Sequence, residues 1–304
     1  MNWIEQLLDR LTAKPICGYR INQSAAAEPT ALAALALCAH ACPSGAITAA
    51  RWLAGLQSSD GSVGVREGEP TPHWPTGLAV LAWQAVAASM DDVSDRVRWQ
   101  PQIERAVQWI LATKGKPLYG LAELGHDTTL VAWPWVEGTH SWIEPTALCV
   151  MALKATGHSN HPRTREAVRM LIDRQLPGGG CNYGNTTVLG QQLRPHLQAT
   201  GLAMAALASE QDSHGRIMKS LAYLRRTLGP QTPTASLCWG LLGLAAHRNF
   251  LPSSSAWLEA AWDRTQNRDK SPYKFALLAL AASTRTPFYA QPLNQVSELI
   301  EDAC

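Results

Sequence analysis

Acidic, imidazole and indole side chains stand directly in front of several apolar segments of the sequence. A carboxyl or imidazole group can give or take a proton, and a buried carboxyl keeps its proton near neutral pH. The face of an indole ring stabilises a positive charge beside it. The side chains concerned are Glu28, His73, Trp74, His140, Trp142, Glu144 and His196. They predict an acid–base site with aromatic walls, provided that the fold brings them together.

Two long connections add further candidates. The stretch "VAWPWVEGTHSWIEPT" (131–146) contains Trp133, Trp135 and Glu137. Its indole rings either plug one end of the fold, with their N–H groups bonded to carbonyls, or form a wall over the mouth of a cavity. The stretch "PGGGCNYGNTTVLGQQLRPH" (177–196) contributes Tyr183, which either lines the site or supports its own loop. Its glycines indicate a turn, because the strand that a phosphate-binding loop requires is missing.

The elements that must position these residues follow a repeat. A small or Pro-containing lead-in and a Thr precede an Ala/Leu segment at 28–40, 74–86, 144–157, 198–209 and 232–247, and 271–283 is a degenerate copy. Pro in the first turn and a nearby Thr mark helix starts. These segments are apolar nearly all round, so we expect six helices that are buried on every side.

Amphipathic segments alternate with them, at 2–13, 46–57, 102–113, 163–175, 215–227 and 255–266. The chain therefore predicts an all-α fold, an α/α toroid of about six helical hairpins with apolar inner helices. We expect one toroid domain over 1–286 and a C-terminal tail over 287–304 that packs on it. Because all hairpins run the same way, the starts of the inner helices should share one end, where their dipoles favour an anion.

One phrase occurs twice, as "AARWLAGLQSSDGSVG" (49–64) and "AVRMLIDRQLPGGGCNYGN" (167–185). The first copy, with the pattern A-x-x-W-L-x-x-x-Q-x-x-D-G-S-x-G at 49–64, resembles the Gln/Trp repeat of squalene–hopene and oxidosqualene cyclases. The helix starts "HWPTGLAVLAW" and "RPHLQATGLAMAAL" are similar to repeats of those cyclases and of protein prenyltransferase β subunits. With length for one toroid only, the chain looks most like small squalene cyclase-like proteins with prenyltransferase repeats.

The resemblance implies a protein that acts on, or holds, an isoprenoid or similar hydrophobic chain in a central cavity. Catalysis would be that of an isomerase, in which an acid starts carbocation chemistry. When "GHDTTLVAWPW" (125–135) is placed on the acidic motif of the family, Asp127 falls on the proton donor and Thr129 on the motif's Thr. The other acids of the hopene cyclase motif are absent, and the competing interpretation is that Asp127 caps a turn.

The sequence thus proposes three catalytic candidates, Asp127, Glu144 and Glu28. The proposed substrate-binding residues are His73, Trp74, Trp133, Trp135, Glu137, His140, Trp142, Tyr183 and His196. Two other classes of function stay open. One is a non-catalytic lipid-carrying or protein-docking toroid. The other is a carbohydrate-active α/α barrel, which Glu28 and Glu144 would serve as paired carboxylates.

Metal and nucleic-acid chemistry are not expected. "DDVSD" (91–95) matches a magnesium–diphosphate motif, but it follows the end of an inner helix and is interpreted as a solvated linker. The Asp-x-Cys zinc ligands of protein prenyltransferases are missing, so no metal and no cofactor are predicted. The net charge of +2 gives no basis for nucleic-acid binding. Scattered cysteines and the lack of an apolar span predict a cytoplasmic protein, with peripheral membrane contact and oligomeric state left open.

Overall fold

The computed structural model describes residues 2–120 and 124–283, so the predicted tail at 287–304 lies outside the described residues. The fold is all-α, as predicted, apart from one short hairpin of strands β1 (Thr187–Val188) and β2 (Gln191–Gln192). The inner helices are α2 (Ala27–Ala39), α4 (Thr76–Ala88), α7 (Ile143–Ala155), α9 (Leu197–Ala206), α11 (Thr234–Ala246) and α13 (Pro272–Ala282).

These inner helices form a ring. Each contacts two others, in the closed cycle α2–α4–α7–α9–α11–α13–α2. Their Ala, Leu, Met and Trp side chains are buried on every face, which explains why the sequence shows no polar stripe along them. The predicted inner segments match these helices to within a few residues at each end.

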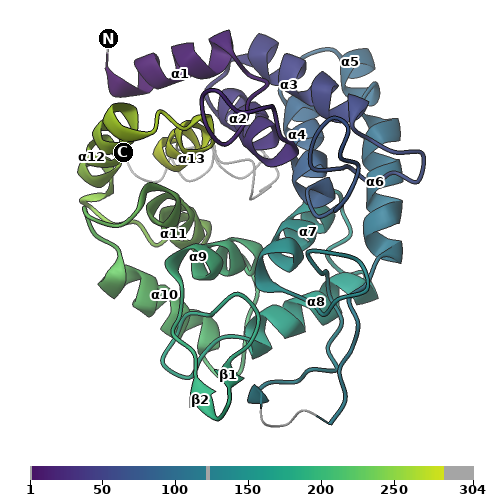
Figure 1. The fold of residues 1–304 in the computed structure, drawn as a ribbon, viewed down its shortest axis with the longest axis vertical. Coiled ribbons are helices and arrows are strands. Elements are labelled where there is room, and N and C mark those ends of the chain that lie inside the picture. Colours follow the sequence, from purple (N-terminus) through teal and green to yellow (C-terminus); the bar gives the residue numbers. More distant parts are fainter. Residues whose placement is uncertain (1, 121–123, 284–304) are drawn as a thin grey trace, which may run out of the picture.

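Six further helices surround the ring (Figure 1). They are α1 (Trp3–Ala13), α3 (Pro43–Gly55), α6 (Gln100–Ala112), α8 (Pro162–Asp173), α10 (Arg216–Thr227) and α12 (Ser254–Arg268). Each buries one stripe and exposes the other; α8, for example, buries Ala167, Val168 and Leu171. The short α5 (Val93–Val97) begins after Asp92, whose side chain accepts a hydrogen bond from the Ser94 amide. The "DDVSD" stretch is therefore an exposed helix cap.

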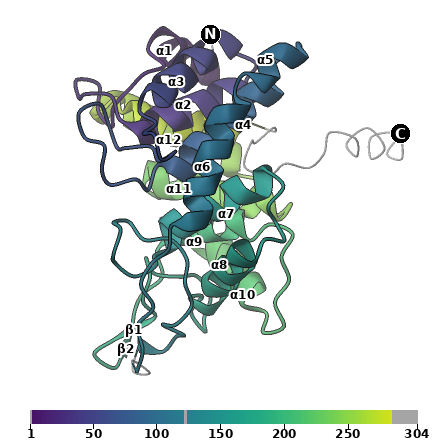
Figure 2. The same ribbon diagram turned by 90° about the vertical axis from the view of Figure 1, so that its right-hand side faces the viewer.

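A buried threonine at the start of four inner helices binds the backbone of the incoming connection. The hydroxyl oxygens of Thr30, Thr76, Thr146 and Thr200 accept hydrogen bonds from the amides of Cys17, Val63, Trp133 and Cys181. The N···O distances are 3.1, 2.9, 3.2 and 3.0 Å in the same order. The long connections lie together on one side of the molecule, the left side in Figure 2. The recurrent Thr thus fixes each connection to the helix that it enters.

At the opposite end of the ring, long polar side chains join neighbouring inner helices. Nε2 of His40 bonds to the carbonyl of Ala279, and Nε2 of His247 to that of Met204, both at 2.9 Å. Lys154 donates to the Ala206 carbonyl at 2.8 Å. These contacts satisfy carbonyls that a helix leaves unpaired in its last turn.

The glutamine of the duplicated phrase binds the next outer helix in both copies. Gln57 donates to the carbonyl of Gln102 at 2.9 Å, on α6. Gln175 accepts from the hydroxyl of Ser220 at 2.8 Å, on α10. In both copies, therefore, the glutamine of the phrase connects one outer helix to the next by a hydrogen bond.

The glycines that follow occupy equivalent places. Gly61 and Gly179 have positive φ angles of 95° and 93°. A Cβ on either would lie 2.2 Å from a backbone carbonyl oxygen, of Arg105 and of Lys219 respectively. Both the backbone conformation and the close approach therefore require glycine.

We predict that Thr76→Val destabilises the protein, by about 1–3 kcal/mol in the free energy of unfolding, because the buried amide of Val63 loses its acceptor. Urea unfolding measures the effect. Thr48→Val is the matched control, since Thr48 is exposed and bonds only within its own helix. Equal effects of the two substitutions would contradict this role of the buried threonine.

We predict that Gly61→Ala is more destabilising than Gly157→Ala. Gly157 also has a positive φ, of 82°, but a Cβ there meets nothing within 4 Å. Gly157→Ala, the control, therefore costs only the strain of an alanine in a left-handed backbone conformation, about 1–2 kcal/mol. Gly61→Ala should add about 1–3 kcal/mol for the forced separation from α6. Thermal and urea unfolding of both variants tests the difference, and equal stabilities would contradict it.

Candidate functional site

Glu28 and Glu144 hold the same register position on two inner helices. Each is the second residue of its helix, α2 or α7, and each is followed by Pro and Thr. The charge of Glu144 makes a minor contribution to the raised pKa of Glu28. These two predicted catalytic residues therefore hold equivalent positions on inner helices that α4 separates in the ring.

Glu144 is the more deeply buried of the two, with 8% of its surface exposed. Its Oε1 accepts a hydrogen bond of 3.1 Å from Nε2 of Gln198, the second residue of α9. Burial raises the pKa of the Glu144 carboxyl to about 7, and the bond from Gln198 opposes that rise. Its Oε2 has no hydrogen bond among the described residues and can meet a ligand.

Glu28 is half-buried, and the Tyr19 hydroxyl donates to its Oε2 at 2.5 Å. Burial raises the pKa of Glu28 to about 7; the Tyr19 bond lowers it and the charge of Glu144 raises it further. Both glutamates are therefore partly protonated at neutral pH. Such groups can act as proton donor or acceptor without a large driving force.

Tyrosine rings stand beside both carboxyl groups. Tyr19 packs on Tyr273 of α13 with ring centroids 5.5 Å apart. Burial raises the pKa of the Tyr273 hydroxyl, and the charges of Glu28 and Glu144 add to the effect. Tyr183 packs on His196 at 4.6 Å, and the charge of Glu144 contributes to its raised pKa. We name this group the acidic mouth: Glu28, Glu144, Gln198, Tyr19, Tyr183 and Tyr273.

Three members of the acidic mouth escaped the sequence analysis. Gln198 stands where Glu28 and Glu144 stand in their repeats, so aligning the helix starts would have found it. Tyr273 replaces the recurrent Thr in the sixth copy, which is a weaker signal. Tyr19 belongs to a connection without repeat features, and only the fold places it beside Glu28.

Four further predicted substrate-binding residues line a cavity apart from the acidic mouth: His73, Trp74, Trp135 and Glu137. Trp74 and Trp135 pack edge to face with centroids 4.8 Å apart, and Nδ1 of His73 lies 3.0 Å from a carboxylate oxygen of Glu137. The cavity between them has a volume of about 10 Å³. It has no room for a hydrocarbon chain in this conformation.

Trp133 and Trp142 make packing contacts in this structure. Trp133 is buried; its indole N–H donates to the Ile110 carbonyl at 2.8 Å, and the Arg163 guanidinium lies 4.9 Å from its ring centroid. Trp142 packs on His140 at 4.5 Å. Trp133 thus fulfils the interpretation in which an indole plugs the fold with its N–H bonded to a carbonyl.

Asp127 lacks the environment of a buried acid. It is exposed, and its Oδ1 accepts hydrogen bonds from the amide and the hydroxyl of Thr129, at 2.9 and 2.6 Å. These bonds lower the pKa of the Asp127 carboxyl. It is ionised at neutral pH and caps a turn, the competing interpretation of its sequence, whereas a proton donor must hold its proton.

The centre of the ring is densely packed in this structure. Apolar side chains on the inner helices, such as Leu35, Leu37 and Leu278, have no exposed surface. Two larger pockets, of about 390 and 260 Å³, are polar and border the outer helices α8, α10 and α12. Leu148, Leu202 and Leu241 on the inner helices keep small exposed fractions of 3–7%. The acidic mouth offers carboxyl groups at one end of this packed ring.

Among the described residues, no group of three or more His, Cys, Asp or Glu side chains could hold a metal ion. Within the same residues, no helix is both long and apolar enough to cross a membrane.

We predict that Glu144→Gln removes a pH dependence of stability. The folded protein raises the pKa of Glu144 from 4.5 to about 7, so it binds more protons than the unfolded chain between these values, and stability falls as pH rises through this window. Gln cannot ionise. The variant should therefore match the natural protein near pH 4.5 and exceed it at pH 8 by up to about 3 kcal/mol.

Urea unfolding at both pH values measures this difference. Glu104→Gln is the control, because Glu104 is exposed on α6 and should give no gain. A Glu144→Gln protein that is no more stable than the natural one at pH 8 would contradict the raised pKa.

Comparisons with known proteins inform the fold alone. No family model matches the sequence, and no curated protein matches it. A crystal structure described as that of a protein from Actinoplanes is similar, with a TM-score of 0.54 and 16% identity over 87% of this chain and 79% of that one. At this identity the likeness shows a shared fold and carries no function to this chain.

Proposed function

We propose that the acidic mouth is an acid–base catalytic site of the terpenoid cyclase type. Its substrate would be an isoprenoid or a similar hydrophobic chain, and Glu144 and Glu28 would share the roles of proton donor and acceptor. One observation carries the proposal: two carboxyl groups in the same helix register, each with a pKa raised to about 7. Buried acids with perturbed pKa values are typical of catalytic sites.

The two carboxyl groups differ in what they can do. Oε2 of Glu144 is available to a ligand, while Oε2 of Glu28 holds the Tyr19 hydroxyl. Glu144 in its protonated form is therefore the better donor, and Glu28 the better acceptor. A carboxyl with a pKa near 7 is a weak acid, which protonates an oxygen atom more readily than an isolated double bond. We therefore favour an isoprenoid that carries an epoxide or hydroxyl group.

The aromatic residues support a cationic intermediate. Tyr19 and Tyr273 stand beside Glu28, and Tyr183 lies close enough to Glu144 to feel its charge. Ring faces stabilise a carbocation without reacting as bases. The proposal places the hydrocarbon against Leu148, Leu202 and Leu241, which lie in the middle of α7, α9 and α11 and are 3–7% exposed.

A carbohydrate is the second candidate substrate. The Gln198 amide and the Tyr19 hydroxyl bind the two carboxyl groups now, and such groups also bind sugar hydroxyls. One protonated and one ionised carboxyl are the pair that glycoside hydrolysis uses. The two candidates differ in the atom that receives the proton, so substrate trials separate them.

The test is turnover in D₂O, followed by extraction and mass spectrometry. The protein is incubated with squalene, its terminal epoxide, polyprenyl diphosphates and a set of oligosaccharides. We expect a cyclised product from the epoxide that has gained one deuterium from the solvent. Glu144→Gln should lower the rate at least about a hundredfold, the size of a general acid contribution, and Glu28→Gln should also slow it.

Asp127→Asn is the matched control, because its carboxylate caps a turn and should leave turnover unchanged. If Asp127→Asn abolishes turnover and Glu144→Gln does not, the assignment to the acidic mouth is wrong. Hydrolysis of an oligosaccharide would establish the second candidate. A stoichiometric, unreacted isoprenoid would indicate a carrier. If no ligand is bound and no substrate is turned over, both catalytic proposals are contradicted.

A further inference from the structure

Arg174, which ends α8, is buried with unpaired donors. It is 4% exposed, and its Nη1 and Nη2 donate to the carbonyls of Gly184 at 2.7 Å and Asp127 at 3.4 Å. A guanidinium has five N–H groups, so three remain. Its Nε has no hydrogen-bond partner at all. Buried charged donors without partners are rare in folded proteins and indicate a site for a water molecule or an ion.

A small cavity lies against this guanidinium. Its volume is about 10 Å³, which holds one particle of about the size of a water molecule. Nε2 of His140 is a second buried atom without a hydrogen-bond partner, and His140 lines the same cavity. The polar side chains of the lining are Lys116, His126, Thr128, His140, Ser141, Arg174 and Asn185.

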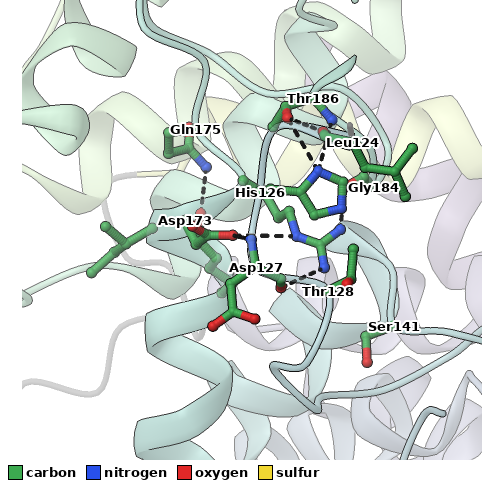
Figure 3. Close-up of polar contacts among 12 residues, drawn as sticks. Leu124, His126, Asp127, Thr128, Ser141, Asp173, Gln175, Gly184 and Thr186 are labelled. Carbon is green, nitrogen blue, oxygen red and sulfur yellow. Dashed lines mark hydrogen bonds and ion pairs between the residues drawn. The ribbon is translucent and has the colours of Figure 1, made fainter. Parts of the chain in front are cut away.

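The charge around the cavity is positive. Arg174 and Lys116 are cationic, and no carboxylate belongs to the lining. The carboxylate of Asp173 lies outside the lining. Its Oδ2 is 3.7 Å from Nε of Arg174, and its Oδ1 is 3.9 Å from Nη1 of Arg216. The carboxylate of Asp127 is taken up by Thr129 and points away from His126 (Figure 3).

The histidines respond to the same charge. Burial, followed by the charge of Arg174, lowers the pKa of His126 to about 4 and also lowers that of His140. Nδ1 of His126 accepts a hydrogen bond of 3.4 Å from the Thr186 amide and lies 3.1 Å from the Thr186 hydroxyl, so this nitrogen is engaged by Thr186. The cavity therefore combines N–H donors with cations, a combination that favours an anion over water.

We propose that this cavity binds a single halide ion, chloride under ordinary conditions, between Arg174, His140 and Lys116. A volume of about 10 Å³ excludes phosphate or a carboxylic acid, and a halide ion, slightly larger than a water molecule, would fill it completely. The ion would join the connection 114–142 to the end of α8 and to the loop at 184–186. Binding to the folded state alone would stabilise the protein in proportion to the logarithm of the chloride concentration, once the site begins to fill.

Two measurements test the proposal. Crystals grown in sodium bromide should show an anomalous peak inside the cavity, within hydrogen-bond distance of Arg174. Thermal unfolding is compared in sodium chloride and in sodium gluconate at equal ionic strength, and Tm should rise with chloride only. Lys116→Met should move the chloride midpoint upward about threefold, the effect of one exposed charge.

Lys219→Met is the matched control, since it removes the same charge from a lysine that lines a different pocket. It should leave the chloride midpoint unchanged. Equal Tm values in the two salts, a water molecule in place of the bromide peak, or equal effects of the two lysine substitutions would each overturn the proposal. Arg174 itself is not substituted, because it supports two carbonyls of the fold.

Discussion

The hydrogen bond from a buried threonine to the incoming backbone is the constraint on which the architecture depends. At four helix starts the hydroxyl sets where the connection crosses the end of the inner helix. The residue two positions before the threonine is thereby placed at the same height in each of these repeats. In α2, α7 and α9 that residue is Glu28, Glu144 or Gln198, so one backbone contact aligns the polar groups of the mouth.

The fold could be inferred from the sequence because its signals are local and repeated. An Ala/Leu segment without a polar stripe has to be surrounded, and an amphipathic one has to lie outside it. Gln57 and Gln175 mark the same joint twice, and a joint that recurs is visible in one sequence. The short hairpin at Thr187–Gln192 and helix α5 carry no repeat and were not foreseen.

The site was only partly predictable. Glu28 and Glu144 were found from their register, whereas Tyr19 reaches Glu28 only through the path of its connection. Asp127 looked like an acid because of its neighbours in the chain, but the protonation of a carboxyl depends on burial, which sequence spacing does not encode. The tryptophans of 131–146 likewise differ in their surroundings. Trp135 packs on Trp74, whereas Trp133 is buried with its N–H bonded to the Ile110 carbonyl, a distinction that depends on three-dimensional contacts.

The closed cycle of inner helices has a consequence for biosynthesis. Helix α2 packs against both α4 and α13, and α1 also contacts α13, through residues at the far end of the described chain. Of the described helices the ribosome delivers α13 last, so one flank of α2 stays without its partner until about residue 282 has emerged. The hairpin of α1 and α2 keeps this apolar flank uncovered while the helices between α2 and α13 are synthesised, which makes it a segment on which chaperones are expected to act.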